Sequence, residues 1–277
     1  MWVIDNQQYL GQLDGWNRAA QFADGLFETM VLKSGMILGL RHHVMRMSQG
    51  LSRLNIALPD ENLAEFFESY ARSFVDLSGV KNGVLKVVVS RGDSQRGYGY
   101  DKSIKPHVTA FYNSAPEYSN EIYSSGVDVT ILNTQCSIQP QLAGLKHLNR
   151  LENVLAKAEL GDLAFEGLMV NHLKFIIEGA MSNVFFEKNS ELITPKLDVS
   201  GVAGVMRQCV MNYAVKNGIK ITEVNITTDD LSAISKGFIC NSVMGIVPIK
   251  TLLKREFKIG EVSTDLIDAW EIGDIYA

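Results

Sequence analysis

Two residues whose types suggest chemistry lie thirty-two positions apart in the chain. Lys146 follows a polar stretch, residues 139–141, and Glu178 stands between the apolar runs 175–177 and 184–186. A lysine whose pKa is lowered by burial can attack a carbonyl, and a carboxylate that is buried requires a partner. From the residues alone, Lys146 is equally a solvated loop lysine and Glu178 a strand-end acid that faces water.

Two further features are typical of anion-binding sites. A glycine-bearing loop, residues 201–208, leads into a predicted helix, and the N–H groups at a helix N-terminus favour an anion. Arg46 lies on another predicted helix, and beside a phosphate an arginine provides two parallel hydrogen bonds. Each signal is weak by itself, because many helices begin after glycine and exposed helix arginines are common.

Other patterns argue against metal, disulfide and glycosidase chemistry. The five histidines lack HxH and HExxH spacing, and the three cysteines lack CxxC spacing. We expect Asp24, Glu28 and Glu152 to be ordinary surface acids, since their spacing does not indicate a catalytic pair. Neither a Gly-x-Ser-x-Gly elbow nor a Walker-type loop occurs in the sequence.

Composition and charge restrict the class of protein. The 277 residues are 46% hydrophobic and 21% charged, which is typical of a globular protein with a sizeable core. The net charge of −5 is spread without blocks of one sign, so we expect neither nucleic acid nor a membrane as partner. No basic residue precedes Arg18, and no apolar run approaches the ~18 residues of a membrane helix. We therefore expect a cytoplasmic protein.

Interleaved helical and strand patterns must position these residues, and they predict an α/β (α+β) chain of two domains. Strands are predicted near 84–90, 108–112, 127–132, 168–170, 184–186 and 238–240, and helices at 44–54, from 59–60 onward, at 150–160 and at 205–216. Residues 114–120 are polar and contain proline, which indicates a linker. We expect a smaller N-terminal α/β domain at 1–113 and a larger C-terminal one at 121–277, with the functional site between them.

Five motifs, in this order along the chain, resemble those of the class IV aminotransferases, which are the fold-type IV pyridoxal-phosphate enzymes. They are residues 22–29 (FADGLFET), 43–47 (HVMRM), 145–149 (LKHLN), 178–185 (EGAMSNVF) and 204–207 (GVMR). The resemblance covers nearly the whole chain. It implies a two-domain fold like that of D-amino acid aminotransferase, with pyridoxal 5'-phosphate between the domains, and a homodimer.

The resemblance also implies a role for each matched residue. Lys146 would hold the cofactor aldehyde and later move a proton, and Glu178 would pair with the pyridine nitrogen and keep it protonated. The chain has methionine where family aminotransferases often have a threonine, so the phosphate contact at that position would come from the backbone. The phosphate would be bound by Arg46, by the N–H groups of Val205 and Met206, and by the Asn241 and Ser242 turn.

Within the family, residues 82–92, 96–98, 140–152 and 206–208 resemble the lyase branch, which converts 4-amino-4-deoxychorismate to 4-aminobenzoate and pyruvate for folate synthesis. That small-molecule substrate has two carboxylates, so Lys86 and, more weakly, Arg96 would bind it. Lys86 sits within an apolar strand, where a lysine is unfavourable without an anionic partner. A hydroxyl at Thr29 would relay a proton to the leaving enolpyruvyl group.

Alternatives to the lyase stay open at this stage. Lys86 is otherwise an outward-facing edge lysine, and Thr29 a strand threonine that bonds to the backbone. The same cofactor residues would serve an aminotransferase acting on D-amino or branched-chain amino acids, against which Lys86 and Thr29 argue. A non-catalytic binding module with the same fold is disfavoured by the intact set of Lys146, Glu178 and Arg46.

Overall fold

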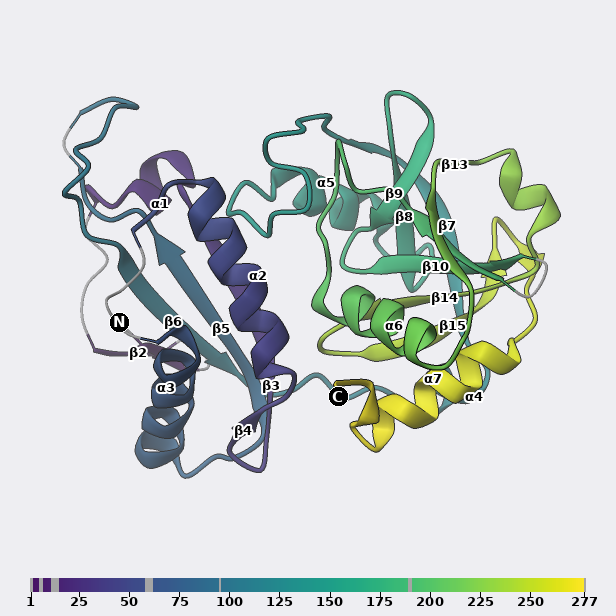
Figure 1. Ribbon diagram of the computed structural model, residues 1–277, viewed down its shortest axis with the longest axis horizontal. Coiled ribbons are helices and arrows are strands. Elements are labelled where there is room, and N and C mark those ends of the chain that lie inside the picture. The colour runs from purple at the N-terminus through teal and green to yellow at the C-terminus, as the bar shows by residue number, and fades with distance from the viewer. Residues whose placement is uncertain are drawn as a thin grey trace. The chain divides into compact units, whose positions relative to one another are not determined.

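The computed structural model of the chain describes residues 2–4, 7–10, 15–57, 62–94, 96–188 and 191–276; for residues 2–4, 7–10, 77 and 78 it describes the backbone only (Figure 1). The chain forms two compact units. Unit 1 comprises Met1–Pro116 together with Leu145–Asn149, and unit 2 comprises Glu117–Gly144 and Arg150–Ala277. The segment Leu145–Asn149, which contains Lys146, belongs to unit 1, and no change in amino-acid composition marks its ends.

The strands described in unit 1 form one sheet in the order β2-β1-β6-β5-β3-β4, in which only β1 and β6 run parallel. Helices α2 and α3 pack against this sheet and against each other (Figure 1). The elements are β1 (Trp2–Ile4), β2 (Gln7–Leu10), α1 (Arg18–Phe22), β3 (Gly25–Lys33), β4 (Met36–Ile37), α2 (Leu40–Arg53), α3 (Leu63–Ser78), β5 (Gly83–Ser90) and β6 (His107–Asn113).

Alternation along β3 and a stripe on α2 make the core of unit 1. Leu26, Glu28, Met30 and Leu32 of β3 are buried, whereas the residues between them are half-buried. The buried residues of α2 recur at helical spacing, with Gly50 so close to β3 that an added Cβ would lie 2.6 Å from Leu26 Cδ1. The predicted start of the next helix, at 59–60, lies outside the described residues; α3 is described from Leu63, after the Asn62 cap.

Unit 2 contains a longer sheet in the order β12-β11-β10-β14-β15-β7-β8-β9-β13, with β16 paired to β15. Its elements are α4 (Glu121–Ser124), β7 (Val127–Cys136), α5 (Leu151–Leu160), β8 (Glu166–Asn171), β9 (Phe175–Gly179), β10 (Asn183–Lys188), β11 (Glu191–Pro195), α6 (Val205–Lys216), β12 (Ile221–Val224), β13 (Ile226–Thr227), η1 (Asp230–Ala233), β14 (Lys236–Asn241), β15 (Gly245–Leu252), β16 (Arg255–Glu256), α7 (Glu261–Glu271) and η2 (Asp274–Tyr276). The mixture of helices and sheets in both units confirms the predicted α/β (α+β) class.

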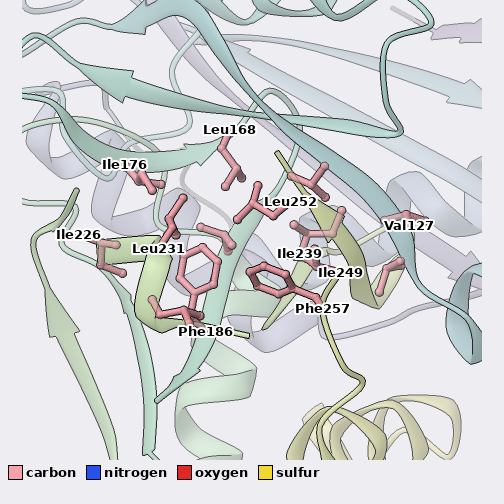
Figure 2. Close-up of a cluster of buried hydrophobic side chains, with 14 of the residues drawn as sticks. Val127, Leu168, Ile176, Phe186, Ile226, Leu231, Ile239, Ile249, Leu252 and Phe257 are labelled. Atoms are coloured by element: carbon pink, nitrogen blue, oxygen red, sulfur yellow. The ribbon is translucent and has the colours of Figure 1, made fainter. Parts of the chain in front are cut away.

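A cluster of branched and aromatic side chains fills one core of unit 2 (Figure 2). Leu168 of β8 and Ile176 of β9 lie in it beside Phe186, Ile239 and Ile249. Every residue of β8 is buried, which explains why the strand predicted at 168–170 is a continuous apolar run. No helix in the described part of the chain is long and apolar enough to cross a membrane.

Leu168→Ala should lower the free energy of unfolding of unit 2 by about 2–5 kcal/mol, because it removes a fully buried side chain and leaves a cavity. Leu163→Ala is the matched control, since Leu163 is 75% exposed and its truncation should change stability by less than about 0.5 kcal/mol. Urea unfolding of the two variants and wild type measures the difference. Equal losses in both variants would contradict the assigned core.

Candidate active site

The half-buried face of β3 lies next to the half-buried face of β5. Thr29 of β3 is directly opposite Lys86 of β5 in the antiparallel register, and Phe27 is opposite Val88. Lys86 is in turn opposite Phe111 of β6. Directly paired residues have their side chains on the same face of a sheet. The structure therefore brings together the two side chains that the sequence linked to substrate, and β5 is an interior strand of its sheet.

The ammonium group of Lys86 lies over aromatic rings rather than in open water. Its Nζ is 4.7 Å from the centre of the Phe27 ring and 5.7 Å from the centre of the Phe111 ring. Burial lowers the pKa of Lys86, because desolvation disfavours the charged form. An anion that approached this face would recover part of the lost solvation, so the position favours a negatively charged ligand.

Lys146 is held beside β3 by backbone hydrogen bonds. The Phe27 N–H donates to the Lys146 carbonyl at 3.0 Å, and the Leu148 N–H donates to the Gly25 carbonyl at 3.0 Å. Lys146 Nζ lies 4.3 Å from the centre of the Phe27 ring. Lys86 Nζ contacts the same ring at 4.7 Å, so the two nitrogens are no more than about 9 Å apart, the sum of these distances. The ring of Phe27 thus places both lysines near Thr29.

Arg46 on α2 makes an ion pair with the other face of β3. Its Nε donates to Glu28 Oε1 at 2.8 Å and its Nη2 to Glu28 Oε2 at 2.5 Å. His43, one turn earlier, has Nδ1 2.6 Å from Glu28 Oε2. The guanidinium therefore binds the Glu28 carboxylate through two of its nitrogens. Arg46 lies on a helix, as predicted from the sequence, but its side chain is largely buried and the ion pair fixes its orientation.

Glu28 is charged and His43 is neutral in this network. Burial alone would raise the pKa of the Glu28 carboxyl, but the charge and hydrogen bonds of Arg46 and the bond from His43 lower it to about 2. Burial lowers the pKa of His43, and the contact with Glu28 only partly opposes this effect. His43 therefore donates its Nδ1–H to a carboxylate that keeps its charge at neutral pH.

The sequence-based expectation of ordinary surface acids is wrong for Glu28 and Asp24. Glu28 is 1% exposed, and Asp24 accepts hydrogen bonds at 2.8 Å from both Arg18 and Arg91. Alternation along β3 was a signal for the burial of Glu28, because it shares a face with apolar neighbours. Glu152 is half-buried and accepts a bond from the Ser137 N–H at 2.8 Å.

Arg96, the weaker predicted substrate residue, is exposed in the loop after β5. Within the described residues, no hydrogen bond or ion pair joins it to Lys86 or Lys146. The following carbonyls of this loop, those of residues 97–99, accept hydrogen bonds from Arg18. The loop is thus held by a residue to which sequence reasoning assigned no role.

Glu178, at the end of β9 in unit 2, is 4% exposed, and its Oε2 accepts a hydrogen bond from the Val202 N–H at 2.8 Å. Gly201 has φ of +83°, and a Cβ there would meet Ile177 Cγ2 at 2.7 Å, so the loop approaches the strand closely only as glycine. Burial raises the pKa of the Cys136 thiol, and the charge of Glu178 raises it further. Cys136 is therefore not a nucleophile in this structure.

The N-terminus of α6 is organised by Asn183. Asn183 Nδ2 donates to the Val202 carbonyl at 3.0 Å, and Asn183 Oδ1 accepts from the Gly204 N–H at 3.1 Å. Helix α6 begins at Val205, followed by Met206, with no side-chain cap at Gly204. A Cβ on Gly204 would lie 2.1 Å from Asn183 Oδ1. Its place in the motif at 178–185 gave no indication of this positioning role.

The Asn241 and Ser242 turn lies at the same edge of the sheet of unit 2. Cys240, the preceding residue, pairs with Asn183 across β14 and β10. Asn241 Oδ1 accepts from the N–H groups of Val243 and Met244, at 2.9 and 2.8 Å, which closes the turn. Glu178, Val205, Met206, Asn241 and Ser242 all belong to unit 2, whereas Lys146, Arg46, Lys86, Thr29 and Arg96 belong to unit 1.

Glu166 is a further buried acid that sequence reasoning missed. It is 1% exposed, and its carboxylate accepts hydrogen bonds from the Gly167 N–H, the Met181 N–H and the Ser182 hydroxyl. Burial raises its pKa, although these bonds oppose the rise. These bonds hold the turn between Glu178 and Asn183. The apolar run that follows Glu166 gave no sign of this role.

The residues present fit pyridoxal phosphate. In unit 1 a half-buried lysine suits an aldehyde and an arginine suits a phosphate. In unit 2 a buried carboxylate suits a protonated ring nitrogen, and a glycine-led helix N-terminus suits an anion. A Cβ on Gly204 would clash with Asn183 Oδ1, and one on Gly201 would lie 2.7 Å from Ile177 Cγ2, so the loop that leads into α6 requires glycine at both positions. No three His, Cys, Asp or Glu side chains gather into a metal site in the described part of the chain.

Known proteins resemble this chain in sequence and in fold. The family described as amino-transferase class IV matches residues 25–252. The chain is similar to an aminodeoxychorismate lyase of Vibrio harveyi, with 34% identity over 88% of each chain. It is also similar to a D-alanine aminotransferase of Bacillus licheniformis, with 26% identity over 85% of this chain and 81% of that one. A solved 4-amino-4-deoxychorismate lyase from Pseudomonas aeruginosa superposes with a TM-score of 0.89 and 32% identity, covering 96% of both chains. The predicted fold type is thereby confirmed.

Glu28→Gln should lower the free energy of unfolding at pH 7 by roughly 3 kcal/mol, since it leaves Arg46 beside a neutral amide. The folded-state pKa of about 2 lies below the ordinary 4.5, so this stabilisation is present above pH 4.5 and is lost as pH falls toward 2. Urea unfolding of wild type and variant at pH 7, 5 and 3 should show the difference shrinking with acid.

Glu68→Gln is the control, because Glu68 makes an exposed pair with Arg72 and its loss should cost less than about 1 kcal/mol. A difference between wild type and Glu28→Gln that stays constant from pH 7 to pH 3 would contradict a charged, depressed-pKa Glu28.

Proposed function

The chain belongs to the class IV aminotransferase family, and we propose that it is a pyridoxal-phosphate-dependent lyase that converts 4-amino-4-deoxychorismate to 4-aminobenzoate and pyruvate in folate synthesis. The observation that carries this proposal is the direct pairing of Thr29 with Lys86 beside Phe27, over whose ring the Lys146 ammonium lies. Similarity to lyases over most of the chain supports it.

We assign the cofactor to residues of both units. Lys146 would hold the aldehyde carbon, Arg46 and the N–H groups of Val205 and Met206 the phosphate, and Glu178 the ring nitrogen. The Asn241 and Ser242 turn would complete the phosphate contacts, with Ser242 offering a hydroxyl. When bound, pyridoxal phosphate supplies an electron sink for the carbon that bears the substrate amine.

Glu28 and His43 would prepare Arg46 for that phosphate. The bidentate ion pair fixes the plane of the guanidinium, so less conformational entropy is lost when an anion binds. The paired carboxylate also reduces the net positive charge of the site. Met206 contributes a backbone N–H and no hydroxyl, consistent with its position in the first turn of α6.

The remaining steps are proton transfers and charge recognition by this chain. The Lys146 amine removes the proton from the carbon next to the substrate nitrogen, and general acid–base help of this kind is worth roughly 10²–10⁴-fold in rate. The Thr29 hydroxyl donates a hydrogen bond to the leaving enolpyruvyl oxygen. The Lys86 ammonium binds a substrate carboxylate, with Arg96 as a second cation for the other carboxylate.

The aminotransferase reading has less support from these residues. A small monocarboxylic amino acid requires one carboxylate contact, whereas Lys86 places a second, partly desolvated cation next to Phe27 and Phe111. We also propose that the enzyme acts in the cytoplasm as a homodimer. Free, buried Cys136, Cys209 and Cys240 suit a reducing compartment, and the dimer is inferred from the family resemblance.

A coupled assay tests the function. Chorismate, an amine source and the upstream synthase generate the substrate, and fluorescence then follows the formation of 4-aminobenzoate. D-alanine half-transamination, measured in the same preparation, tests the aminotransferase alternative. Rapid D-alanine reaction without 4-aminobenzoate formation would replace the lyase assignment with the aminotransferase one.

Lys146→Ala should abolish lyase activity and the covalent attachment of cofactor. Borohydride treatment followed by mass spectrometry should find a stable cofactor adduct on wild type and none on the variant, because no other amine is assigned to the aldehyde. Circular dichroism should show that the fold persists. A retained adduct in the variant would show that another residue binds the aldehyde.

Lys86→Met should lower lyase kcat/KM by an amount equivalent to about 2–5 kcal/mol, because it removes one partner of a partly buried charge contact. Thr29→Val should lower lyase kcat with little change in cofactor binding, because it removes a hydroxyl and keeps the branched shape. Both activities, 4-aminobenzoate formation and D-alanine half-transamination, are measured for both variants. A parallel fall of the two activities in both variants would contradict lyase-specific roles.

A further inference from the structure

We propose that Arg18 is a positioning residue that folds the loop after β5 into the shape in which Arg96 meets a substrate carboxylate. The inference rests on the proposed function for its substrate and on the contacts of unit 1 for its mechanism. Arg18 begins α1 and is 3% exposed, although arginine is among the residues that are least often buried.

The guanidinium of Arg18 donates hydrogen bonds to four acceptors in the loop that follows β5. Nη1 donates to Ser94 Oγ at 2.9 Å and to the Gly97 and Gly99 carbonyls at 3.3 and 3.2 Å. Nη2 donates to the Tyr98 carbonyl at 2.9 Å. Three successive carbonyls therefore point toward a single cation. A guanidinium offers five N–H donors in one plane, more than any neutral side chain.

Two aromatic rings, one from α1 and one from the loop, pack against the Arg18 guanidinium. The Arg18 guanidinium carbon lies 4.9 Å from the centre of the Phe22 ring and 5.5 Å from that of Tyr100. The ring of Tyr98 packs on Phe22 with centres 5.3 Å apart, and Arg91 lies 3.8 Å from the Tyr100 ring centre. Arg18 itself is only 3% exposed, so the hydrogen bonds that it makes are stronger than they would be in water.

Asp24 connects the loop to the strand that bears Phe27 and Thr29. Its Oδ2 accepts from Arg18 Nε and from Arg91 Nε, both at 2.8 Å, and its carbonyl accepts from the Arg91 N–H at 3.1 Å. Burial would raise the pKa of Asp24, but the bonds and charges of Arg91 and Arg18 lower it. Asp24, which immediately precedes β3, is therefore charged at neutral pH and binds both arginines.

Arg96 stands immediately before the three bound carbonyls. Its side chain is exposed, so its direction depends on the backbone of the turn, in which Gly97 has φ of +87°. An exposed arginine on a loose loop loses much conformational entropy on binding, whereas one on a fixed turn loses less. Arg18 would thus raise affinity for a dicarboxylate without touching it.

The experiment is a double-mutant cycle of Arg18→Met and Arg96→Met, with hydrogen exchange of residues 92–100 as a second readout. Arg18→Met should speed exchange in this loop at least tenfold and raise KM for 4-amino-4-deoxychorismate about tenfold, with kcat changed less than twofold. In the Arg96→Met background, Arg18→Met should raise KM no further, because it acts through Arg96. Arg18→Lys, with one nitrogen in place of a fork, should give an intermediate KM.

Arg72→Met, at an exposed pair on α3, is the control and should alter neither exchange of the loop nor KM. Multiplicative KM effects in the double variant, or an unchanged exchange rate in Arg18→Met, would overturn the positioning role. Failure of the proposed function is separate: wild type would then form no 4-aminobenzoate, and the exchange readout alone would decide whether Arg18 holds the loop.

Discussion

The alternation of side chains along β3 is the constraint on which the candidate site depends. One face buries Glu28 against Arg46 and His43, and the other presents Phe27 and Thr29 beside Lys86. A shift of one residue in the pairing with β5 would exchange the two faces and place Glu28 beside Lys86. Apolar neighbours on the Glu28 face resist that shift, because they would be exposed by it. Core packing in unit 1 therefore specifies which side chains can meet a ligand.

Charge balance within the molecule explains why its buried acids behave differently. Glu28 has two cationic or hydrogen-bonding partners on one helix, so its pKa falls to about 2 despite complete burial. Glu166 has only neutral donors close to its oxygens, and burial raises its pKa. The same side chain thus serves as a counter-ion in unit 1 and as a hydrogen-bond acceptor that shapes a turn in unit 2. At similar burial, a cationic partner therefore decides the direction in which the pKa shifts.

Sequence patterns predicted several of the local elements, since these depend on nearby residues, but they predicted no strand at β3. The helix predicted at 205–216 is α6 with the same bounds, and the β-branched run at 84–90 lies within β5. Alternation along the strand also predicted that Lys86 points away from the apolar face formed by Leu85 and Val87. The partners of Arg18 and the return of residues 145–149 to unit 1 depend on contacts across many residues. Periodicity carries no information about such contacts, so the network of Arg18, Asp24 and Arg91 could not be predicted.

The residues proposed to bind the cofactor and those proposed to select the substrate contribute differently to the stability of the fold. Arg46 and Glu28 join α2 to β3, and Asn183 joins β10 to the loop that precedes α6, so all three also hold the protein together. A substitution at any of them affects the fold as well as the site. Thr29 and Lys86 are half-buried on an interior pair of strands, and their neighbours across the sheet are held by backbone hydrogen bonds that do not involve their side chains. Such positions can change at little cost in stability. The proposed preference for a dicarboxylate would therefore rest on the part of β3 and β5 that core packing constrains least, and a change of that preference would cost least stability at this face.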